Sequence, residues 1–324
     1  MTPEARPSRE APVLWFVVPC LDEEQVLPET ARALAAKLDA LTAAGDVARG
    51  SRILLVDDGS RDATWEVVRS LHEADGRVAG LRLAHNAGQQ KALYAGLMRA
   101  LEGGCDCAVT IDADLQDDVD AVDEMLRRFS EGAEVVYGVR ESRDADGTLK
   151  RGTAGLFYRL MGWLGAETVP EAADFRLMGR RSLEALARYE EANLFLRGIV
   201  PSLGFETAQV RYARSPRAAG TSKYSLGRML GLALDGITSF SIRPVRIVTC
   251  MGLLAILVSL AMIAYALASS VAGSVVAGWT SLMISVWLVG GMLMTSLGVV
   301  GEYVGRTYLE AKRRPRYIVA ETLD

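Results

Sequence analysis

Histidine and cysteine are scarce in this sequence of 324 residues, which contains two histidines and four cysteines. The cysteines form no C-x-x-C pair, so we expect reduced core cysteines and no zinc site. A large excess of one charge is also lacking, because the formal net charge is only −4. A general nucleic-acid binder would carry a basic surface, and this composition argues against that class.

Two nucleotide-binding motifs are missing as well. No G-x-G-x-x-G follows the first apolar run, which disfavours a nicotinamide dinucleotide site, and no G-x-x-x-x-G-K-[ST] occurs, which excludes a P-loop protein. An N-terminal signal peptide is not expected, because residues 1–11 are polar and contain no apolar core. We predict that these residues form a disordered leader.

Charged residues are entirely absent from 247–301. Such a stretch is long enough for two helices of about 20 residues each across a hydrocarbon layer about 30 Å thick. We predict two transmembrane helices, at 245–269 and 279–300, within a membrane region that spans 245–303. One buried helical hairpin is the alternative, but apolar residues cover every face of both segments.

Basic residues flank this region on both sides, whereas the segment between its two helices carries no charge. Arg243 and Arg246 precede the region, and a second basic group follows it: Arg306, Lys312, Arg313, Arg314 and Arg316. Basic flanks stay on the cytoplasmic side of a membrane. The sequence therefore predicts a multi-pass protein of the plasma (inner) membrane, with both termini, the N-terminal two thirds and a tail at 304–324 in the cytoplasm.

The N-terminal half of the sequence alternates short apolar runs with helical periodicity. We expect strands at 13–19, 52–58, 78–83, 107–112 and 134–140, and helices at 24–41, 63–72, 89–101 and 118–130. This alternation predicts an α/β domain at 12–224, with a mostly parallel sheet and helices on both faces. An interfacial amphipathic helix is expected at 225–244, directly before the membrane region.

Polar side chains follow each of the first four expected strands, in the strings PCLDEE, DDGSRD, HNAGQQK and DADLQDD. In open sheets of this class, ligands bind at the carboxyl ends of the parallel strands, where these strings would meet. The sequence therefore predicts one binding site built from four loops.

Asp112 and Asp114 come directly after the fourth strand, on either side of Ala113. Two carboxylates this close resist joint ionisation unless a cation lies between them. Gln116 adds a neutral oxygen, and oxygen ligands with open positions suit Mg²⁺ or Mn²⁺ held together with substrate phosphates. We therefore predict a metal and nucleotide site here, and the alternative is a solvated acidic loop that caps a helix.

Other acids in these loops are open to two interpretations. Asp57 and Asp58 could accept hydrogen bonds from a nucleotide base or ribose, or they could simply form a turn. Glu23 could contact ribose or act as a first-turn acid of a helix. Asp117 and Asp118 precede a helix, and we expect them to stabilise its N-terminus.

Six ordered strings resemble glycosyltransferase family 2: VVPCLDEE, LLVDDGSRDATW, HNAGQQKALYAGL, IDADLQDD, ADFRLMGR and RSPRAAGTSKYSL. Within that family they resemble the polyprenyl-phosphate branch, the dolichol-phosphate-mannose-synthase-like enzymes, and the paired C-terminal spans resemble bacterial members that charge undecaprenyl phosphate. The resemblance covers about 12–315. It implies a GT-A-type fold, a homo-oligomer, and an inverting transfer of a sugar from a nucleotide sugar, UDP-glucose first and GDP-mannose second.

The resemblance also implies roles for individual residues. Metal ligands would be Asp112, Asp114 and Gln116, and the catalytic residues would be Asp114 and the DFR-motif aspartate, Asp174. Nucleotide contacts would come from Pro19, Leu21, Glu23, Asp57, Asp58, Lys91, Asp112 and Ala113. The lipid phosphate would be bound by Arg140 and Arg151, with Lys223 and Ser225 in a loop that closes over the site.

The chemistry of such a transfer fits these residues. A divalent cation stabilises the charge that gathers on a leaving nucleoside diphosphate. The attacking phosphate monoester has a second pKa of about 6, so no strong base is needed at neutral pH. We therefore expect Asp174 to orient the sugar or the phosphate more than to remove a proton. The alternative is that Asp174 only pairs with Arg176 on an exposed loop, and that the basic residues only attract anionic lipids.

Two rival functions remain at this point. A processive polysaccharide synthase would carry a Q-x-x-R-W motif and more membrane spans, and the string QVRYARS from Gln209 does not fit that motif. A non-catalytic membrane scaffold with the same fold would not need Asp112, Asp114 and Asp174, which are all present.

Overall fold

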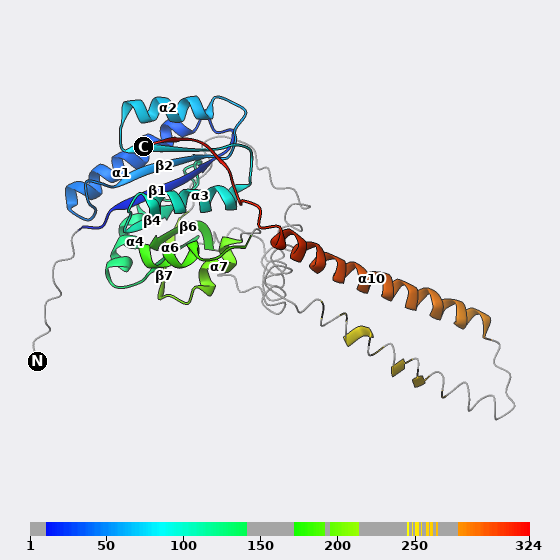
Figure 1. Ribbon diagram of the computed structural model, residues 1–324. Coiled ribbons are helices and arrows are strands. Elements are labelled where there is room, and N and C mark those ends of the chain that lie inside the picture. The colour runs from blue at the N-terminus through cyan, green and yellow to red at the C-terminus, as the bar shows by residue number, and fades with distance from the viewer. Residues whose placement is uncertain are drawn as a thin grey trace, which may run out of the picture. The chain divides into compact units, whose positions relative to one another are not determined.

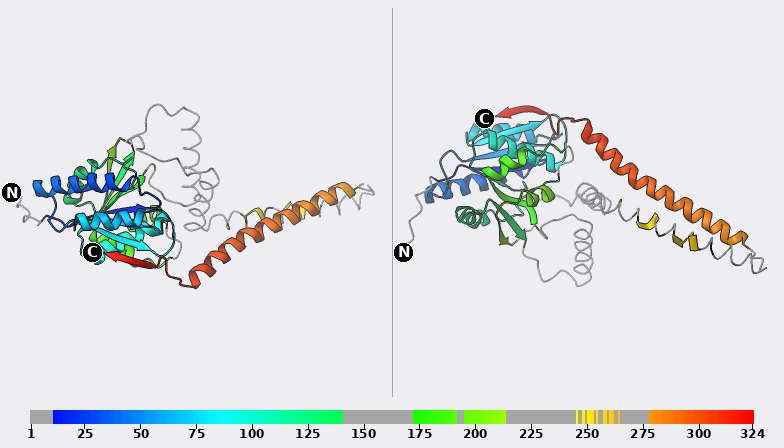
Figure 2. Two further views of the ribbon diagram at one scale, coloured as in Figure 1. Left: turned by 90° about the horizontal axis from the view of Figure 1, so that it is seen from above. Right: turned by 60° about the horizontal axis from the view of Figure 1, so that its bottom comes forward.

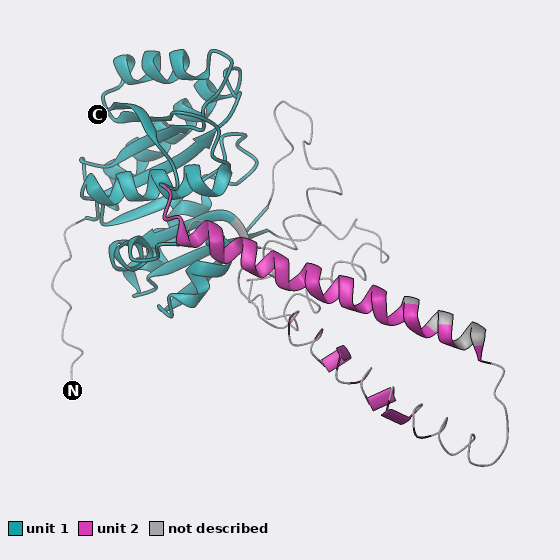
Figure 3. Cartoon of the chain, turned by 45° about the vertical axis from the view of Figure 1, so that its right-hand side comes forward, with its two compact units in different colours: residues 1–158, 167–225, 315–324 teal, residues 159–166, 226–314 magenta. Residues whose placement is uncertain are grey.

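The computed structural model of the chain describes residues 11–140, 172–191, 195–213 and 278–324, with isolated helical residues between 245 and 264 (Figure 1). Some predicted features lie outside these residues: the leader up to residue 10, most of the first membrane span, the interfacial helix at 225–244, Arg151, Lys223 and Ser225. The chain divides into two units (Figure 3). Unit 1 comprises 1–158, 167–225 and 315–324, and unit 2 comprises 159–166 and 226–314.

Unit 1 contains an eight-stranded sheet in the order β7-β5-β6-β4-β1-β2-β3-β8. The strands are β1 (Leu14–Cys20), β2 (Arg52–Asp57), β3 (Val78–Leu83), β4 (Cys107–Thr110), β5 (Val135–Arg140), β6 (Ala172–Gly179), β7 (Thr207–Tyr212) and β8 (Val319–Leu323). Its helices are α1 (Leu27–Ala44), α2 (Thr64–Ala74), α3 (Gln89–Glu102), α4 (Ala121–Ser130), α6 (Arg180–Ala187) and α7 (Leu196–Ser202). The α/β class and the alternation through β5 are as predicted.

The sheet is mixed rather than continuously parallel. The adjacent strands β4, β1, β2 and β3 pair in parallel, and β5 pairs in parallel with β7. Strand β6 lies between β4 and β5 and is antiparallel to both, and β8 is antiparallel to β3. Strands β6, β7 and β8 were not predicted, because they come after the regular strand–helix alternation has ended.

Helices cover both faces of this sheet. Phe16 and Ile53 belong to a buried cluster that includes residues of α1, α2 and α4. On the other face, α3 lies so close to β1 and β2 that a Cβ atom on Gly96 would come within 2.4 Å of Val17 and 2.8 Å of Val56. Successive strand residues point to opposite faces. The lack of a side chain at Gly96 therefore allows α3 to pack directly against β1 and β2.

The C-terminal residues form part of unit 1, which the predicted tail at 304–324 did not foresee. The segment enters the sheet as β8, beside the edge strand β3, and the chain ends near α2 (Figure 1). Glu321 accepts hydrogen bonds from Trp65 Nε1 and from Arg69, each at 2.9 Å. Leu323 packs against the buried cluster. Five residues at the end of the chain thus protect the edge of β3.

Unit 2 contains α10 (Trp279–Ala311), a continuous helix in both views of Figure 2. It begins at the residue where the second predicted span begins. Its part from Leu288 to Ala311 is long and apolar enough to cross a membrane, and its large apolar side chains, such as Leu293 and Met294, are exposed. Within the described ranges this is the one helix that meets that criterion. The other predicted transmembrane helix, at 245–269, stays a prediction.

Candidate functional site

The predicted loops gather at the carboxyl ends of β1, β2, β3 and β4 in unit 1, as their parallel pairing requires. Pro19 and Cys20 are the last residues of β1, and their strand partners are Val56 and Asp57 of β2. Hydrogen bonds join the two following loops, since Ser60 Oγ accepts from the Asp22 amide at 3.0 Å and Thr64 Oγ1 accepts from the Glu23 amide at 2.9 Å. The loops after β1 and β2 therefore form one connected surface.

Asp57 is fully buried at the end of β2. Its Oδ1 accepts a hydrogen bond from the Ser60 amide at 2.9 Å, and its Oδ2 lies 3.4 Å from Arg82 Nε on β3. Both the turn interpretation and an ion pair thus apply to this residue.

Asp58 holds the loop that follows β3. Its two carboxylate oxygens accept hydrogen bonds from the amides of Ala87 at 2.7 Å and Gly88 at 2.9 Å. Burial raises the pKa of Asp58, and these two hydrogen bonds offset only part of that effect. Gly59 has φ +71°, and a Cβ atom there would lie 2.6 Å from the backbone of His85. Asp58 and Gly59 therefore bring the loops after β2 and β3 together.

The remaining predicted nucleotide residues lie around these loops. Leu21 and Glu23 are half-buried after β1, and Lys91 is half-buried in the first turn of α3. Ala113 is buried, and its carbonyl oxygen accepts a 2.6 Å hydrogen bond from Thr30 Oγ1 of α1.

Four aspartates lie close together after β4 and on β6. Burial raises the pKa of Asp112 to about 7, and the charges of Asp117, Asp174 and Asp114 contribute to the rise. Gln89 Nε2, at the start of α3, donates to Asp112 Oδ1 at 3.0 Å. The half-buried Asp114 accepts a hydrogen bond from the Gln116 amide at 3.2 Å. Burial and the neighbouring carboxylates together therefore disfavour the ionised form of Asp112.

This charge pattern fits a divalent cation. The buried Asp117 Oδ2 has no hydrogen-bond partner in the described part of the chain, and the neighbouring carboxylates that raise the pKa of Asp112 would also attract a positive charge. Within the same residues, no three acidic, histidine or cysteine side chains are already arranged around a metal position. The cluster supplies charge and oxygen atoms rather than a preformed coordination shell.

Asp117 does not lie at the N-terminus of a helix, where it was predicted from the sequence. It is 3% exposed, and α4 begins only at Ala121, after Asp120 as the N-cap residue. Asp117 Oδ1 accepts a 2.5 Å hydrogen bond from Tyr212 Oη of β7 and lies 3.2 Å from Arg140 Nη2 of β5. Asp117 therefore links the loop after β4 to Arg140, the arginine that the family resemblance assigns to the acceptor.

Asp174 lies within a buried ion-pair network, and the alternative of an exposed loop pair is wrong. Asp174 is 5% exposed and Arg176 is 2% exposed, and their side chains meet at 2.8 Å. Arg197 of α7 donates to both Asp174 oxygens, at 3.1 and 3.0 Å, and Gln90 of α3 donates at 3.2 Å. Burial alone would raise the pKa of Asp174, but the charges of Arg176 and Arg197 outweigh it and hold the pKa below the usual range.

Sequence reasoning missed three residues of this site: Gln90, Arg197 and Tyr212. Gln90 joins two elements, because its side chain also accepts a 3.1 Å hydrogen bond from the Leu196 amide of α7. Arg197 and Tyr212 lie on short elements, α7 and β7, that periodicity does not detect. Their only sequence signal is the chemistry of the side chain itself.

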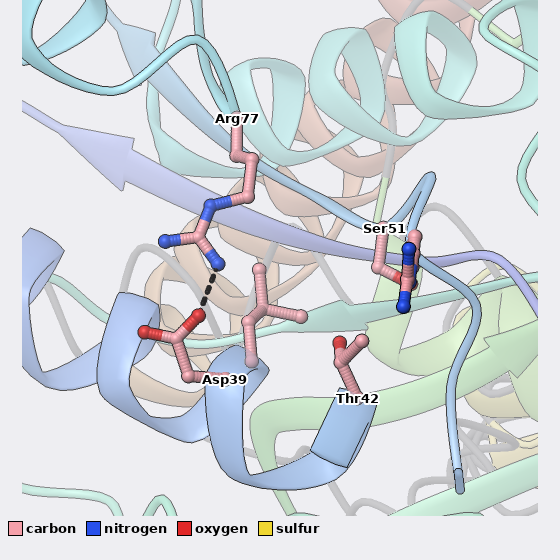
Figure 4. Close-up of a pocket in the computed structure, with 6 residues that line it drawn as sticks. Asp39, Thr42, Ser51 and Arg77 are labelled. Atoms are coloured by element: carbon pink, nitrogen blue, oxygen red, sulfur yellow. Dashed lines mark hydrogen bonds and ion pairs between the residues drawn. The ribbon is translucent and has the colours of Figure 1, made fainter.

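A separate hollow of about 240 Å³ lies at the other end of the strands (Figure 4). It is lined by Leu38, Asp39, Thr42, Arg49, Ser51 and Arg77. Arg77 pairs with Asp39 at 2.5 Å and with Asp75 at 2.8 Å, so its charge is neutralised within the fold. We assign no site to this hollow.

Comparison with known proteins agrees with the motif pattern. The model of "Glycosyl transferase family 2" matches residues 15–187. The chain is 48% identical to the "Uncharacterized glycosyltransferase YkoT" of Bacillus subtilis, over 95% of this chain and 91% of that protein. It is 39% identical to the "Prophage bactoprenol glucosyl transferase homolog" of Escherichia coli, over 82% of this chain and 87% of that protein.

Among solved structures, glucosyl-3-phosphoglycerate synthase from Mycobacterium tuberculosis aligns with a TM-score of 0.45 and 18% identity, over 70% of this chain and 76% of that one. That likeness is too distant to carry a functional argument. The family match and the identities over most of the chain lead to one conclusion: the chain belongs to glycosyltransferase family 2.

Proposed function

We propose that this protein is a membrane-bound, metal-dependent, inverting glycosyltransferase. It moves a sugar from a nucleotide sugar to a polyprenyl phosphate such as undecaprenyl phosphate. The observation that carries the proposal is the acidic cluster at the carboxyl ends of the strands, with Arg140 held at its border by Asp117. The 39% identity to a bactoprenol glucosyl transferase homolog supports a lipid acceptor and favours UDP-glucose over GDP-mannose.

The donor is assigned to the loops after β1, β2, β3 and β4. Base and ribose would contact the surface formed by Pro19, Leu21, Glu23, Asp57 and Asp58, with Lys91 near the phosphates. Mg²⁺ or Mn²⁺, bound by Asp112, Asp114 and Gln116, would neutralise the charge that develops on the leaving diphosphate. Binding should also remove the proton from Asp112, because a cation stabilises the ionised carboxylate.

The reaction itself is a single displacement at the anomeric carbon. An oxygen of the lipid phosphate forms the new bond to this carbon, while the bond to the nucleoside diphosphate breaks and its electron pair leaves with the diphosphate. The configuration at the carbon inverts. Since the attacking phosphate is mostly dianionic at neutral pH, it needs no strong base.

Asp174 acts in this scheme as an orienting group. Its pKa is held below the usual range, so it stays ionised and is a weak proton acceptor at neutral pH. Its two oxygens fix Arg197, whose side chain is half exposed and directed by two hydrogen bonds. Asp174 thereby places a positive charge beside the acidic cluster.

The acceptor phosphate is assigned to Arg140, with Arg151, Lys223 and Ser225 as further candidates beyond the described residues. Arginine binds phosphate through two parallel hydrogen bonds, which suits a lipid headgroup. We further propose that the membrane region contains two spans with both termini in the cytoplasm, and that the enzyme forms a homo-oligomer. The helix α10 and the basic residues after it support the first of these points.

The test is a transfer assay with the purified full-length protein. Undecaprenyl phosphate is incubated with Mn²⁺ and a panel of radiolabelled nucleotide sugars, and the lipid fraction is counted. We expect label from one donor, UDP-glucose first, in a product that mild acid releases as free sugar. Label in a polymer would indicate a polysaccharide synthase, and an absence of both Mn²⁺-dependent donor binding and label would indicate a scaffold.

A further inference from the structure

Arg140 is held by two residues for which sequence reasoning gave no role in catalysis. It is the last residue of β5, and its register partner on β7 is Tyr212. Arg140 Nε donates to Tyr212 Oη at 3.2 Å, and Arg140 Nη2 lies 3.2 Å from Asp117 Oδ1. Tyr212 Oη in turn donates to the same Asp117 oxygen at 2.5 Å. The three side chains form a closed triangle.

This triangle occupies one edge of the guanidinium group. Nε and Nη2 share that edge, and both are bound within the triangle. On the other edge, formed by Nη1 and Nη2, Nη1 makes no hydrogen bond or ion pair within the described ranges, and the Arg140 side chain is 32% exposed. The free edge carries two parallel N–H groups, the geometry that binds phosphate oxygens in pairs.

The support behind Arg140 is rigid. The Asp117 side chain is 1% exposed, and Tyr212 is 3% exposed. The Tyr212 ring packs edge-to-face against Phe175, with centroids 5.2 Å apart and an interplanar angle of 86°. Phe175 directly follows Asp174, so the support is continuous with the ion-pair network of the site.

We propose that Asp117 and Tyr212 are positioning residues that fix the Nε–Nη2 edge of Arg140 and present its Nη1–Nη2 edge to the phosphate of the acceptor. This inference rests on the proposed function. Because Asp117 lies in the loop of Asp112 and Asp114, the same residue ties the acceptor arginine to the donor cation site. The spacing of the two substrates is then set by one loop rather than by two independent ones.

Two variants test the support without removing Arg140. Tyr212→Phe deletes the hydroxyl and keeps the ring against Phe175, and Asp117→Asn keeps the shape and deletes the charge. Loss of one such hydrogen bond corresponds to about a fivefold to tenfold loss of affinity. We expect each variant to raise the KM for undecaprenyl phosphate by about that factor. In Tyr212→Phe the KM for the nucleotide sugar should stay within about twofold, because this substitution leaves every carboxylate of the acidic cluster in place.

Tyr137→Phe is the matched control. Tyr137 is also buried and lies on β5, but its hydroxyl has no hydrogen-bond partner among the residues that the structure describes. Both KM values of this variant should equal those of the wild type. A purely structural loss in Tyr212→Phe would lower kcat and the melting temperature together and leave the ratio of the two KM values unchanged.

Three outcomes contradict the inference. If the wild type transfers sugar to the lipid but the variants have an unchanged KM for the acceptor, the positioning role of Asp117 and Tyr212 is refuted. The proposed function is unaffected by that result. An equal rise in both KM values of Tyr212→Phe shows general damage and also refutes the positioning role. A wild type that transfers no sugar to any polyprenyl phosphate overturns the proposed function, and the support falls with it.

Discussion

Asp174→Asn should destabilise unit 1 through the buried network and not merely stop catalysis. The carboxylate pairs with Arg176, which is 2% exposed, and with the half-exposed Arg197. Breaking a buried ion pair from one side typically costs 3–5 kcal/mol, and the exposure of Arg197 places our expectation at about 3 kcal/mol. For a unit of roughly 200 residues this corresponds to a melting temperature lower by about 6–12 °C.

The pH dependence of this loss follows from the pKa of Asp174. Because the folded-state pKa lies below the ordinary value of 3.8, the carboxylate stabilises the fold above that pH, and the effect is lost as the pH falls through the folded pKa. The difference in melting temperature between wild type and Asp174→Asn should therefore be constant near pH 7 and shrink below pH 3.8.

Differential scanning fluorimetry of the detergent-solubilised protein measures both effects. Glu184→Gln is the control, because its pair with Arg180 is about half exposed on both sides and should contribute less than about 1 kcal/mol. If Asp174→Asn and Glu184→Gln had the same melting temperature at pH 7, the ion-pair network of Asp174, Arg176 and Arg197 would not stabilise the fold as proposed.

Other predictions concern the site and the chain end. Asp114→Asn should abolish transfer with an unchanged melting temperature, because the substitution keeps the shape of this half-buried side chain and removes the charge that would hold the cation; substantial turnover would refute its metal role. Chelation with EDTA should stop transfer and Mn²⁺ should restore it, whereas activity in EDTA would exclude metal dependence. Arg140→Ala should raise the KM for undecaprenyl phosphate at least tenfold more than that for the nucleotide sugar, and equal effects would refute its assignment. Glu321→Ala should lower the melting temperature through lost bonds to Trp65 and Arg69, and an unchanged value would show that β8 is dispensable.

The sequence was sufficient for the parallel centre of the sheet, and the polar loops that it marks lie together at the carboxyl ends of those strands. Buried strands such as 52–57 are largely apolar runs, and each is followed by a polar loop. Both the strands and the loops can therefore be recognised in the sequence. It was insufficient for β6, β7 and β8. Strand β7 is largely exposed and β8 is short, so neither has the hydrophobic pattern of a central strand.

The limits within the site have the same physical origin. Asp112 and Asp114 could be selected because their spacing on one strand end is visible in the sequence. The partners of Asp117 and Asp174 could not, because Tyr212 lies 95 residues from Asp117 and Arg197 lies 23 residues from Asp174. Only the tertiary fold brings such pairs together. Asp117, which the sequence suggested to be a solvated acid, is therefore a buried structural residue.

The most direct test of the account is anomalous diffraction at the manganese edge, on the protein in complex with Mn²⁺ and the nucleoside diphosphate of its donor. We expect one manganese ion bound by Asp112 or Asp114 and by the diphosphate, on the side of the cluster that Arg140 borders. Manganese found elsewhere on the protein, or a diphosphate bound away from these two aspartates, would contradict it.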